Sequence, residues 1–335
     1  MSAPILPFTR IPSSAQGGDL SAPQAGTLGL LGVPSSLGAY APGQENAPAA
    51  LREAGLVDRL RQSGLQVIDH GDGELARWRP DRDYPYAQNL FGVVRIVDQT
   101  ARRTVTVLQD EGFALILGGD CTVSIGVVRA AAALGSVGLV YFDLHADLNT
   151  PASVPDGALD WMGMAHMLAL PGAEPGLRDV GHTTPLLRPE DVVFFAHDDR
   201  RATAWEREQI GSLGLRLFPV PQVSADPRLA AQLALAAFGP AYEQLVVHFD
   251  ADVVDFNDAP LSEHTGRNTG ISLATAIEAL DVLLADDRVV ALSITEINPI
   301  HAAADDTALP RLIDGLARVL RGSRRTASPP AAEAH

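Results

Sequence analysis

Short apolar runs recur along the middle of this 335-residue chain, and several are apolar on both faces. Runs such as FALIL and QLVVHFD lack the alternation of a half-exposed strand, which is typical of parallel strands covered by helices on both sides. Strands are predicted at 27–33, 65–69, 113–117, 137–142, 192–195, 215–220, 245–250 and 289–294. Helices are predicted between them at 47–63, 90–110, 124–134, 202–213, 227–237, 272–284 and 306–321.

The regular alternation of strands and helices, without a long linker, predicts a single domain. We expect a three-layer α/β/α fold around a doubly wound, mostly parallel sheet of about eight strands. A (β/α)8 barrel has the same alternation and stays open as the alternative topology. Residues 1–26 and 322–335 are rich in Pro, Ser, Ala and Gly. They are predicted as a flexible arm and a disordered tail around a domain at 27–321.

The composition excludes several classes of function. The formal net charge is −16 without any basic cluster, so a nucleic-acid-binding face is not expected. The chain has no lysine, which excludes a Schiff-base mechanism, and its single cysteine, Cys121, cannot form an intrachain disulfide. We find neither a signal peptide nor an apolar run of roughly 18 residues, and therefore expect a cytoplasmic protein without membrane contact.

Polar clusters follow four of the predicted strands: GGDCTVSIG (118–126), DLHADLNT (143–150), DADVVDF (250–256) and TEINP (295–299). Asp143, His145 and Asp147 recur with a period of two, which places them on one face of an extended segment. Asp250 and Asp252 repeat this spacing at another strand end. Carboxylates gathered in one crevice repel each other, and divalent cations remove that cost. This donor set predicts a site for Mn²⁺, Zn²⁺ or Fe²⁺, with bridging carboxylates that suit a pair of ions.

The same four segments resemble the motifs of the arginase–agmatinase family, the ureohydrolases. The family motifs are Gly-Gly-Asp-His-Ser, Asp-x-His-x-Asp, Ser-Phe-Asp-x-Asp-x-x-Asp and Glu-x-Asn-Pro. This chain has GGDCT, DLHADLNT, HFDADVVDF and TEINP in the same order, and its early segment GVPSSLGAY is more similar to arginases than to agmatinases. The resemblance covers about residues 27–320. It implies a parallel α/β sheet, two Mn²⁺ ions, hydrolysis of a small guanidino compound to urea and an amine, and a homo-oligomer, either a trimer or a hexamer.

The resemblance also implies a role for each matched residue. The expected metal ligands are Cys121, Asp143, His145, Asp147, Asp250 and Asp252. Asp143 and Asp250 would bridge the ions, Cys121 and Asp147 would complete the first, and His145 and Asp252 the second. Asp147 would also orient the attacking water and pass its proton to the leaving amine. Glu296 would pair with the planar guanidinium group.

Two of the departures from the family pattern change residues of the candidate site. Cys121 replaces the ligand histidine of Gly-Gly-Asp-His-Ser. A thiolate there suits Zn²⁺ or Fe²⁺ better than Mn²⁺, and the alternative is a buried thiol without metal. An ungapped match of residues 147–162 to the arginase loop places Asn149 at a contact to the substrate α-carboxylate. It places Asp156 at a serine contact, and Asp160 at the position of a proton-shuttling histidine.

The leading hypothesis is therefore a binuclear-metal amidinohydrolase that acts on arginine or a close relative. N-hydroxyarginine, agmatine, guanidinobutyrate and formiminoglutamate stay open, because Asn149 favours an α-amino-acid substrate whereas Asp156 opposes one. A catalytically impaired regulatory family member is the alternative from another class. Cys121 and Asp160 favour that alternative, and the intact carboxylates oppose it.

Overall fold

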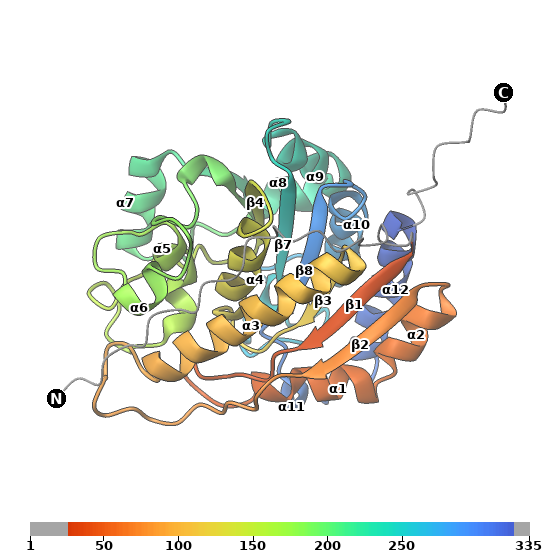
Figure 1. Ribbon diagram of the computed structural model, residues 1–335, viewed down its shortest axis with the longest axis horizontal. Coiled ribbons are helices and arrows are strands. Elements are labelled where there is room, and N and C mark those ends of the chain that lie inside the picture. The colour runs from red at the N-terminus through yellow and green to blue at the C-terminus, as the bar shows by residue number, and fades with distance from the viewer. Residues whose placement is uncertain (1–25, 325–335) are drawn as a thin grey trace.

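The computed structural model describes residues 26–324, and it contains the predicted alternation of strands and helices (Figure 1). The strands are β1 (Thr27–Gly32), β2 (Gln66–Asp72), β3 (Ala114–Leu117), β4 (Val137–Phe142), β5 (Val192–His197), β6 (Arg216–Pro219), β7 (Gln244–Asp250) and β8 (Val289–Thr295). The longer helices are α1 (Ala47–Glu53), α2 (Leu56–Gln62), α3 (Leu90–Glu111), α4 (Val123–Ala132), α7 (Ala204–Leu213), α9 (Pro227–Ala236), α10 (Leu273–Leu283) and α12 (Ala308–Arg324). Each predicted strand is confirmed within one to three residues at its ends.

Two features of the helices differ from the prediction. The helix predicted at 47–63 is two helices, because Gly55 between them has a φ of 91°, which ends α1 before α2 begins. Four short helices were not predicted: α5 (Gly163–Met167), α6 (Pro175–Arg178), α8 (Val220–Ala225) and α11 (Pro299–Ala302). Each of these has four to six residues. A segment of that length has too few turns to show a helical period.

The eight strands form one open sheet in the order β2-β1-β3-β8-β7-β4-β5-β6. Every neighbouring pair is parallel. Because β2 and β6 are edge strands that do not pair with each other, the sheet does not close and the barrel alternative is wrong. The doubly wound three-layer prediction is correct.

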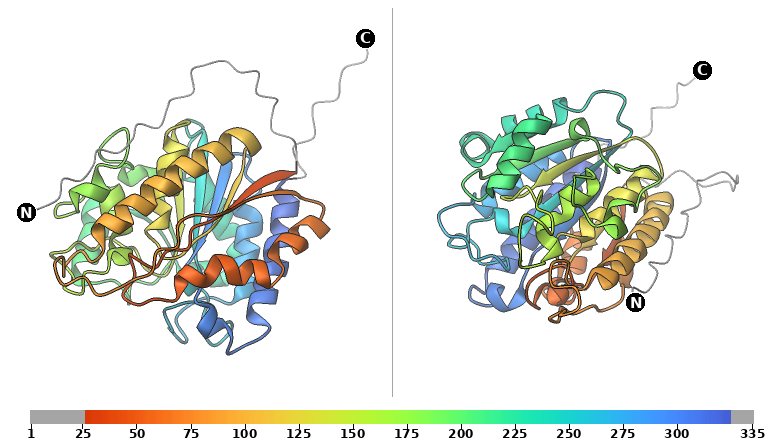
Figure 2. Two further views of the ribbon diagram at one scale, coloured as in Figure 1. Left: turned by 60° about the horizontal axis from the view of Figure 1, so that its bottom comes forward. Right: turned by 90° about the vertical axis from the view of Figure 1, so that its left-hand side faces the viewer.

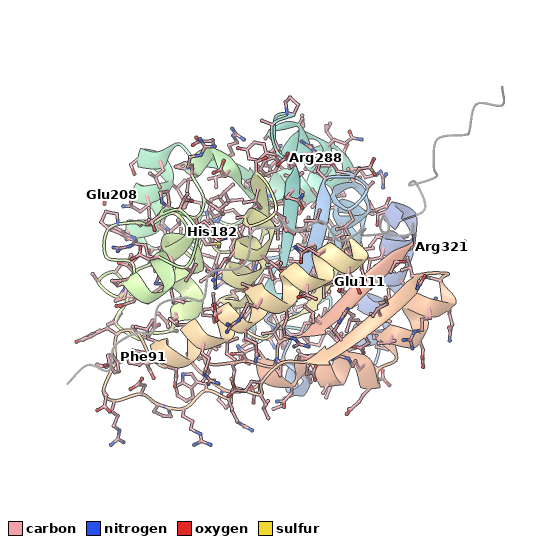
Figure 3. All side chains as sticks on the ribbon, in the orientation of Figure 1. Phe91, Glu111, His182, Glu208, Arg288 and Arg321 are labelled. Atoms are coloured by element: carbon pink, nitrogen blue, oxygen red, sulfur yellow. The ribbon has the colours of Figure 1, made fainter. Side chains whose placement is uncertain are left out.

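Helices cover both faces of the sheet, as the turned views of Figure 2 show. Side chains from alternate strand positions enter two separate cores. Leu115 and Leu117 of β3 belong to the core beneath α1, α2, α9, α10 and α12, whereas Ala114 and Ile116 belong to the core beneath α3 and α4. Burial on both faces explains why these strands read as continuous apolar runs. Exposed charged residues such as Glu208 and Arg321 project from the outer layers (Figure 3).

The predicted arm and tail lie outside the described residues, except for Gly26 and for residues 322–324, which continue α12. No helix within residues 26–324 is long and apolar enough to cross a membrane. The four central strands of the sheet are β3, β8, β7 and β4. These are the strands whose carboxyl ends lead into the four polar clusters of the sequence, so the fold brings the clusters to one edge of the sheet.

Candidate active site

The loop between β3 and α4 carries Cys121 and is held close to the loop that follows β1. A Cβ on Gly119 would lie 1.6 Å from the Ser35 carbonyl oxygen, so only glycine fits there. The Gly119 carbonyl accepts the Glu296 N–H at 2.8 Å, and the Ser35 carbonyl accepts the Asp120 N–H at 3.0 Å. These backbone contacts fix Cys121 and Glu296 on adjacent segments at the end of the sheet.

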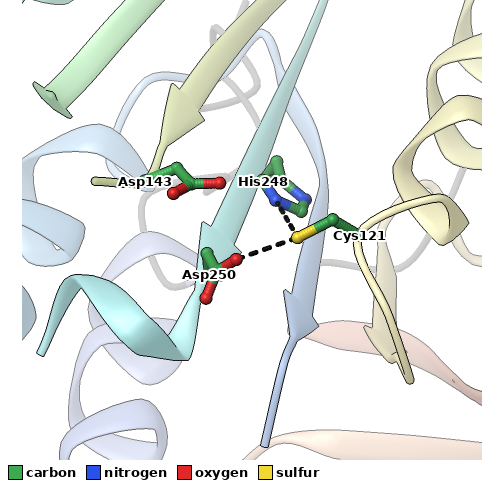
Figure 4. A group of neighbouring side chains, drawn as sticks. All are labelled: Cys121, Asp143, His248 and Asp250. Carbon is green, nitrogen blue, oxygen red and sulfur yellow. Dashed lines mark hydrogen bonds between the residues drawn. The ribbon is translucent and has the colours of Figure 1, made fainter. Parts of the chain in front are cut away.

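A first cluster of four buried side chains consists of Cys121, Asp143, His248 and Asp250 (Figure 4). One potential ligand atom from each lies within 4.8 Å of the others. The Cys121 thiol donates to Asp250 Oδ2 at 2.9 Å, and its Sγ is 3.5 Å from His248 Nε2. The donors are one sulfur, one imidazole nitrogen and two carboxylates, which are all groups that bind transition-metal ions.

A second cluster consists of Asp143, His145 and Asp252 and shares Asp143 with the first. His145 Nδ1 lies 3.0 Å from Asp252 Oδ2 and 3.4 Å from Asp143 Oδ1. Cys121 is also grouped with Asp160 and Glu296, again with ligand atoms within 4.8 Å. Five of the six predicted ligands, all but Asp147, therefore meet in two adjoining groups, and a carboxylate common to both is suited to bridging two ions.

Burial dominates the electrostatics of the site. It raises the pKa of Asp143 to about 6 and that of Asp160 to about 8, and nearby carboxylates add to both shifts. Burial also raises the pKa of Asp250, Glu296 and the Cys121 thiol well above their usual ranges. Such shifts mean that the anionic forms are poorly stabilised by the protein alone.

Three buried carboxylate oxygens of the site have no hydrogen-bond partner among residues 26–324: Asp143 Oδ2, Asp252 Oδ1 and Glu296 Oε1. A buried polar atom without a partner is costly, and such an atom in a native protein calls for an explanation. Divalent cations in the two clusters would supply partners and opposite charge to the ligand carboxylates. The residues present therefore fit a pair of metal ions.

In the absence of cations, the free energy of unfolding should fall as the pH rises from about 7 to about 8.5. A carboxyl group whose pKa is raised on folding binds its proton more tightly in the folded state. The stability it contributes is lost as the pH rises from the unfolded pKa of about 4 through the folded pKa, which for Asp160 is about 8. Denaturant titrations in excess chelator at the two pH values measure the effect. Saturating Mn²⁺ should abolish it, and a metal-free protein that gains stability over this range would contradict the account.

A cavity of about 250 Å³ opens above the two clusters. Its lining comprises Tyr40, Cys121, His145, Asp147, Asn149, Asp160, Trp161, Arg201, Thr203, Glu206, Asp250, Asp252, Glu263, His264 and Glu296. The rings of Tyr40 and Trp161 meet edge to face with centroids 6.3 Å apart. The outer part of the cavity thus combines aromatic surface with Arg201 and Glu263, whereas its floor is acidic.

Asp147 and Asn149 line the cavity as predicted, but each is engaged by neighbours. Asp147 lies outside both clusters, its Oδ2 accepts a hydrogen bond from the Tyr141 hydroxyl, and its φ is 49°. Asn149 Oδ1 accepts from Thr203 Oγ1 at 2.9 Å and from Ser153 Oγ at 3.1 Å, which leaves its amide nitrogen for a ligand.

Asp160 and Glu296 lie on the cavity floor beside Cys121. Asp160 Oδ1 accepts the Cys121 N–H at 3.1 Å. Glu296 Oε2 accepts from Gln44 Nε2 at 3.1 Å, and its other oxygen has no partner among residues 26–324. A fixed carboxylate with one oxygen unengaged is suited to a planar cationic ligand.

The structure does not bring Asp156 to the cavity, and this corrects the prediction of a substrate contact. Asp156 is exposed, and its Oδ1 accepts the N–H of Ala158 at 3.1 Å. Its carbonyl accepts from Gln88 Nε2 at 2.7 Å, and Gly157 beside it has a φ of 73° and packs against the Pro85 carbonyl. This turn directs the loop away from the site, which an ungapped count along the sequence cannot detect.

Residues at or beside the site that the sequence analysis did not identify include His248, Tyr40, Trp161 and Glu263. A signal existed for His248, because it precedes Asp250 by two positions on β7 and therefore lies on the same face of the strand. The remaining three come from separate loops, and only the fold brings them together.

Buried carboxylates, imidazoles and a thiol around a single cavity in an open α/β sheet define an enzyme site of the metal-hydrolase kind. The family model described as Arginase family matches residues 27–311, and the chain belongs to this family of hydrolases. The arginase of Bacillus subtilis is 28% identical over 275 residues, which are 82% of this chain and 91% of that protein.

Solved structures show the same fold. The crystal structure of arginase from Bacillus subtilis subsp. subtilis matches with a TM-score of 0.75 at 24% identity, covering 89% of this chain and 98% of that one. Formimidoylglutamase from the same organism matches with a TM-score of 0.68 at 15% identity, covering 96% and 98%. Proteins named for different substrates therefore share this architecture, and the fold alone does not select the substrate.

Proposed function

We propose that this protein is a binuclear-metal amidinohydrolase that converts a guanidino compound, arginine or a close relative, to urea and an amine. The observation that carries the proposal is the pair of buried clusters that share Asp143 and lie beside Glu296 on a cavity floor. Membership of the arginase family supports it. Two divalent cations at this site would supply an activated water molecule near neutral pH and a Lewis acid.

In this proposal Asp143 and Asp250 would help to hold both metal ions. Cys121 and Asp147 would hold the first ion with them, and His145 and Asp252 would hold the second. Mn²⁺ suits the carboxylates and imidazole of the second position, whereas Zn²⁺ or Fe²⁺ is compatible with the thiol side of the first.

In this proposal the remaining polar groups of the cavity bind the substrate and transfer the proton of the attacking water molecule. Glu296 pairs with the guanidinium through the oxygen that lacks a partner, while Gln44 holds the other oxygen in place. Asp147 takes up a proton from the attacking water and delivers it to the leaving amine, with the Tyr141 hydroxyl orienting its carboxylate. Asp160 stands beside Glu296 as a second acid that can relay the proton.

The outer cavity favours a substrate that carries a carboxylate. Arg201 supplies a positive charge there, and the amide nitrogen of Asn149 supplies a donor. An amino group could be accepted by Glu263, which also lines the cavity. These contacts favour arginine, N-hydroxyarginine or guanidinobutyrate over agmatine, which has no carboxylate for Arg201 to bind.

A substrate panel tests the proposal. The protein, loaded with Mn²⁺, Zn²⁺ or Fe²⁺, is incubated with arginine, N-hydroxyarginine, agmatine, guanidinobutyrate and formiminoglutamate. We expect urea from at least one carboxylate-bearing guanidino compound and no urea after treatment with a chelator. If formiminoglutamate were the one compound hydrolysed, with release of formamide, the proposed urea-forming activity would be wrong and the site would have a different activity of the family. No product from any compound would support the regulatory alternative.

A further inference from the structure

Cys121 and His248 form a pair that joins the loop after β3 to strand β7. In this chain the cysteine stands where the Gly-Gly-Asp-His-Ser motif has its histidine, and a histidine stands where the Ser-Phe-Asp-x-Asp motif has its serine. The two exchanged side chains face each other across the cluster, with Sγ and Nε2 3.5 Å apart (Figure 4). An imidazole is thus retained at the first metal position, but it comes from β7 instead of the loop after β3.

We infer that His248 is a ligand of the first metal position together with Cys121, and that this thiolate–imidazole pair makes the position selective for Zn²⁺ over Mn²⁺. The inference rests on the proposed function only in requiring that the clusters hold metal ions. In the proposed function the first metal position has only thiol and carboxylate ligands. The inference gives it a mixed ligand set of Cys121, His248, Asp143 and Asp250.

The separation of the donor atoms fits a single tetrahedral ion. Zinc–sulfur and zinc–nitrogen bonds of about 2.3 and 2.0 Å at a tetrahedral angle place the two donors about 3.5 Å apart. Cys121 Sγ and His248 Nε2 are separated by 3.5 Å. The shorter 2.9 Å from Sγ to Asp250 Oδ2 is a thiol hydrogen bond, whose proton a metal ion would replace.

The His248 ring is already oriented as a ligand. Its Nδ1 lies 3.3 Å from Ser293 Oγ, and the ring stacks on Tyr141 with centroids 4.4 Å apart and planes 9° from parallel. Metal-bound histidines commonly donate their second ring N–H to such a partner, which fixes the tautomer and leaves the other nitrogen for the ion. Ser293 on β8 therefore directs the lone pair of Nε2 toward Cys121.

A buried histidine nitrogen without a hydrogen-bond partner costs free energy, so the surroundings of His248 Nε2 bear on its role. Within the described part of the chain, the contacts given for Nε2 are Cys121 Sγ and Thr295 Oγ1, both at 3.5 Å. A nitrogen–oxygen distance of 3.5 Å is longer than an effective hydrogen bond, so the close partner of Nε2 is the Cys121 sulfur, which is a weak hydrogen-bonding atom. His248 is fully buried, and water cannot serve as a substitute from bulk solvent. A ligated cation would satisfy Nε2, the thiolate and Asp143 Oδ2 together.

The donor types explain the expected selectivity. A thiolate and an imidazole with two carboxylates match the ligand preferences of Zn²⁺, whereas Mn²⁺ prefers oxygen donors. The second cluster, Asp143, His145 and Asp252, has no sulfur donor. The two positions should therefore differ in metal preference, with Zn²⁺ at the first and either ion at the second.

X-ray absorption spectroscopy of the whole wild-type chain with one equivalent of Zn²⁺ tests the ligand set without any substitution. We expect one sulfur at about 2.3 Å and imidazole scattering from about 2.0 Å around the same zinc. The His145→Ala variant removes the imidazole of the second cluster, and His264, which also lines the cavity, belongs to neither cluster; the imidazole that persists beside sulfur in the zinc shell therefore comes from His248. Zinc without sulfur in its shell, or without imidazole in His145→Ala, would overturn the inference.

Equilibrium dialysis against equal concentrations of Mn²⁺ and Zn²⁺ provides the second measurement. His248→Gln should lower the zinc affinity of one position at least tenfold, and Cys121→Ser should abolish its preference for zinc. His166→Gln is the matched control, because His166 is equally buried and belongs to none of the clusters within residues 26–324. It should bind metal as the wild type does. Equal zinc affinity in His248→Gln and wild type would refute a ligand role.

Neither measurement uses turnover, so the outcomes separate the two proposals. Zinc held by Cys121 and His248 in a protein that hydrolyses no guanidino compound would support the ligand set and refute the proposed function. If the wild type released urea but His248→Gln bound zinc as tightly as the wild type, the proposed function would be supported and the ligand set would be refuted.

Discussion

Replacing Asp252 by alanine should reduce urea release by more than about a hundredfold while the chain stays folded. About a hundredfold is the upper range for losing a partner that only orients a metal ligand, and loss of a ligand itself exceeds it. Asp252 Oδ2 lies 3.0 Å from His145 Nδ1, and its Oδ1 has no partner within residues 26–324. In the proposed ligand set, removing this carboxylate leaves the second position with His145 and the two shared carboxylates of Asp143 and Asp250, which weakens its hold on the ion.

Metal analysis and circular dichroism should accompany this measurement. The variant should retain one ion per chain where the wild type retains two, with an unchanged far-ultraviolet spectrum. Asp191→Ala is a suitable control, because Asp191 is also buried but contacts Tyr242 and Arg188, away from the cavity. It should cost stability and leave the specific activity intact. Wild-type turnover by Asp252→Ala would remove this residue from the site.

Replacing Glu296 by glutamine should lower kcat/KM for the preferred guanidino substrate by about 10- to 100-fold, with metal content unchanged. A hydrogen bond to a charged group contributes about 1.5–3 kcal/mol, which corresponds to that range. The substitution keeps the size of the side chain and one carbonyl oxygen but removes the negative charge that pairs with the guanidinium. Competitive inhibition by guanidinium ion should weaken in parallel.

The control for this change is Glu111→Gln. Glu111 is as buried as Glu296, but it lies at the end of α3 and pairs with His70 at 3.2 Å, far from the lining of the cavity. We expect full activity from this variant. If Glu296→Gln lost metal instead of substrate affinity, Glu296 would be a ligand of the first position and the assignment of the guanidinium pocket would be wrong.

The sheet was predictable because its strands are buried on both faces. Runs such as residues 137–142 are apolar throughout, and the acidic residues that follow them must then lie at the carboxyl edge. The same logic brought Asp143 and Asp250 together from strands that pair side by side. Strand order was not predictable, because alternation along the chain is identical in an open sheet and in a barrel.

The parts of the site that were missed depend on contacts between distant segments. Asp156 was misplaced because the turn at Gly157 is set by packing against Pro85, which no local pattern records. Tyr40, Trp161 and Glu263 meet only through loop packing. His248 was overlooked because it sits inside an apolar strand, although its spacing from Asp250 carried the information.

The position of β8 has a consequence for how the chain is made. This strand lies between β3 and β7 and is the strand whose hydrogen bonds join β2-β1-β3 to β7-β4-β5-β6 in one sheet. During synthesis, β1, β2 and β3 are complete long before β8 is made. The free edge of β3 then has no partner strand until Val289–Thr295 leaves the ribosome. Cys121 belongs to the β2-β1-β3 part and Asp143 and Asp250 to the other, so a nascent chain cannot gather the first cluster. Metal capture by the first cluster is therefore expected only after β8 has been synthesised.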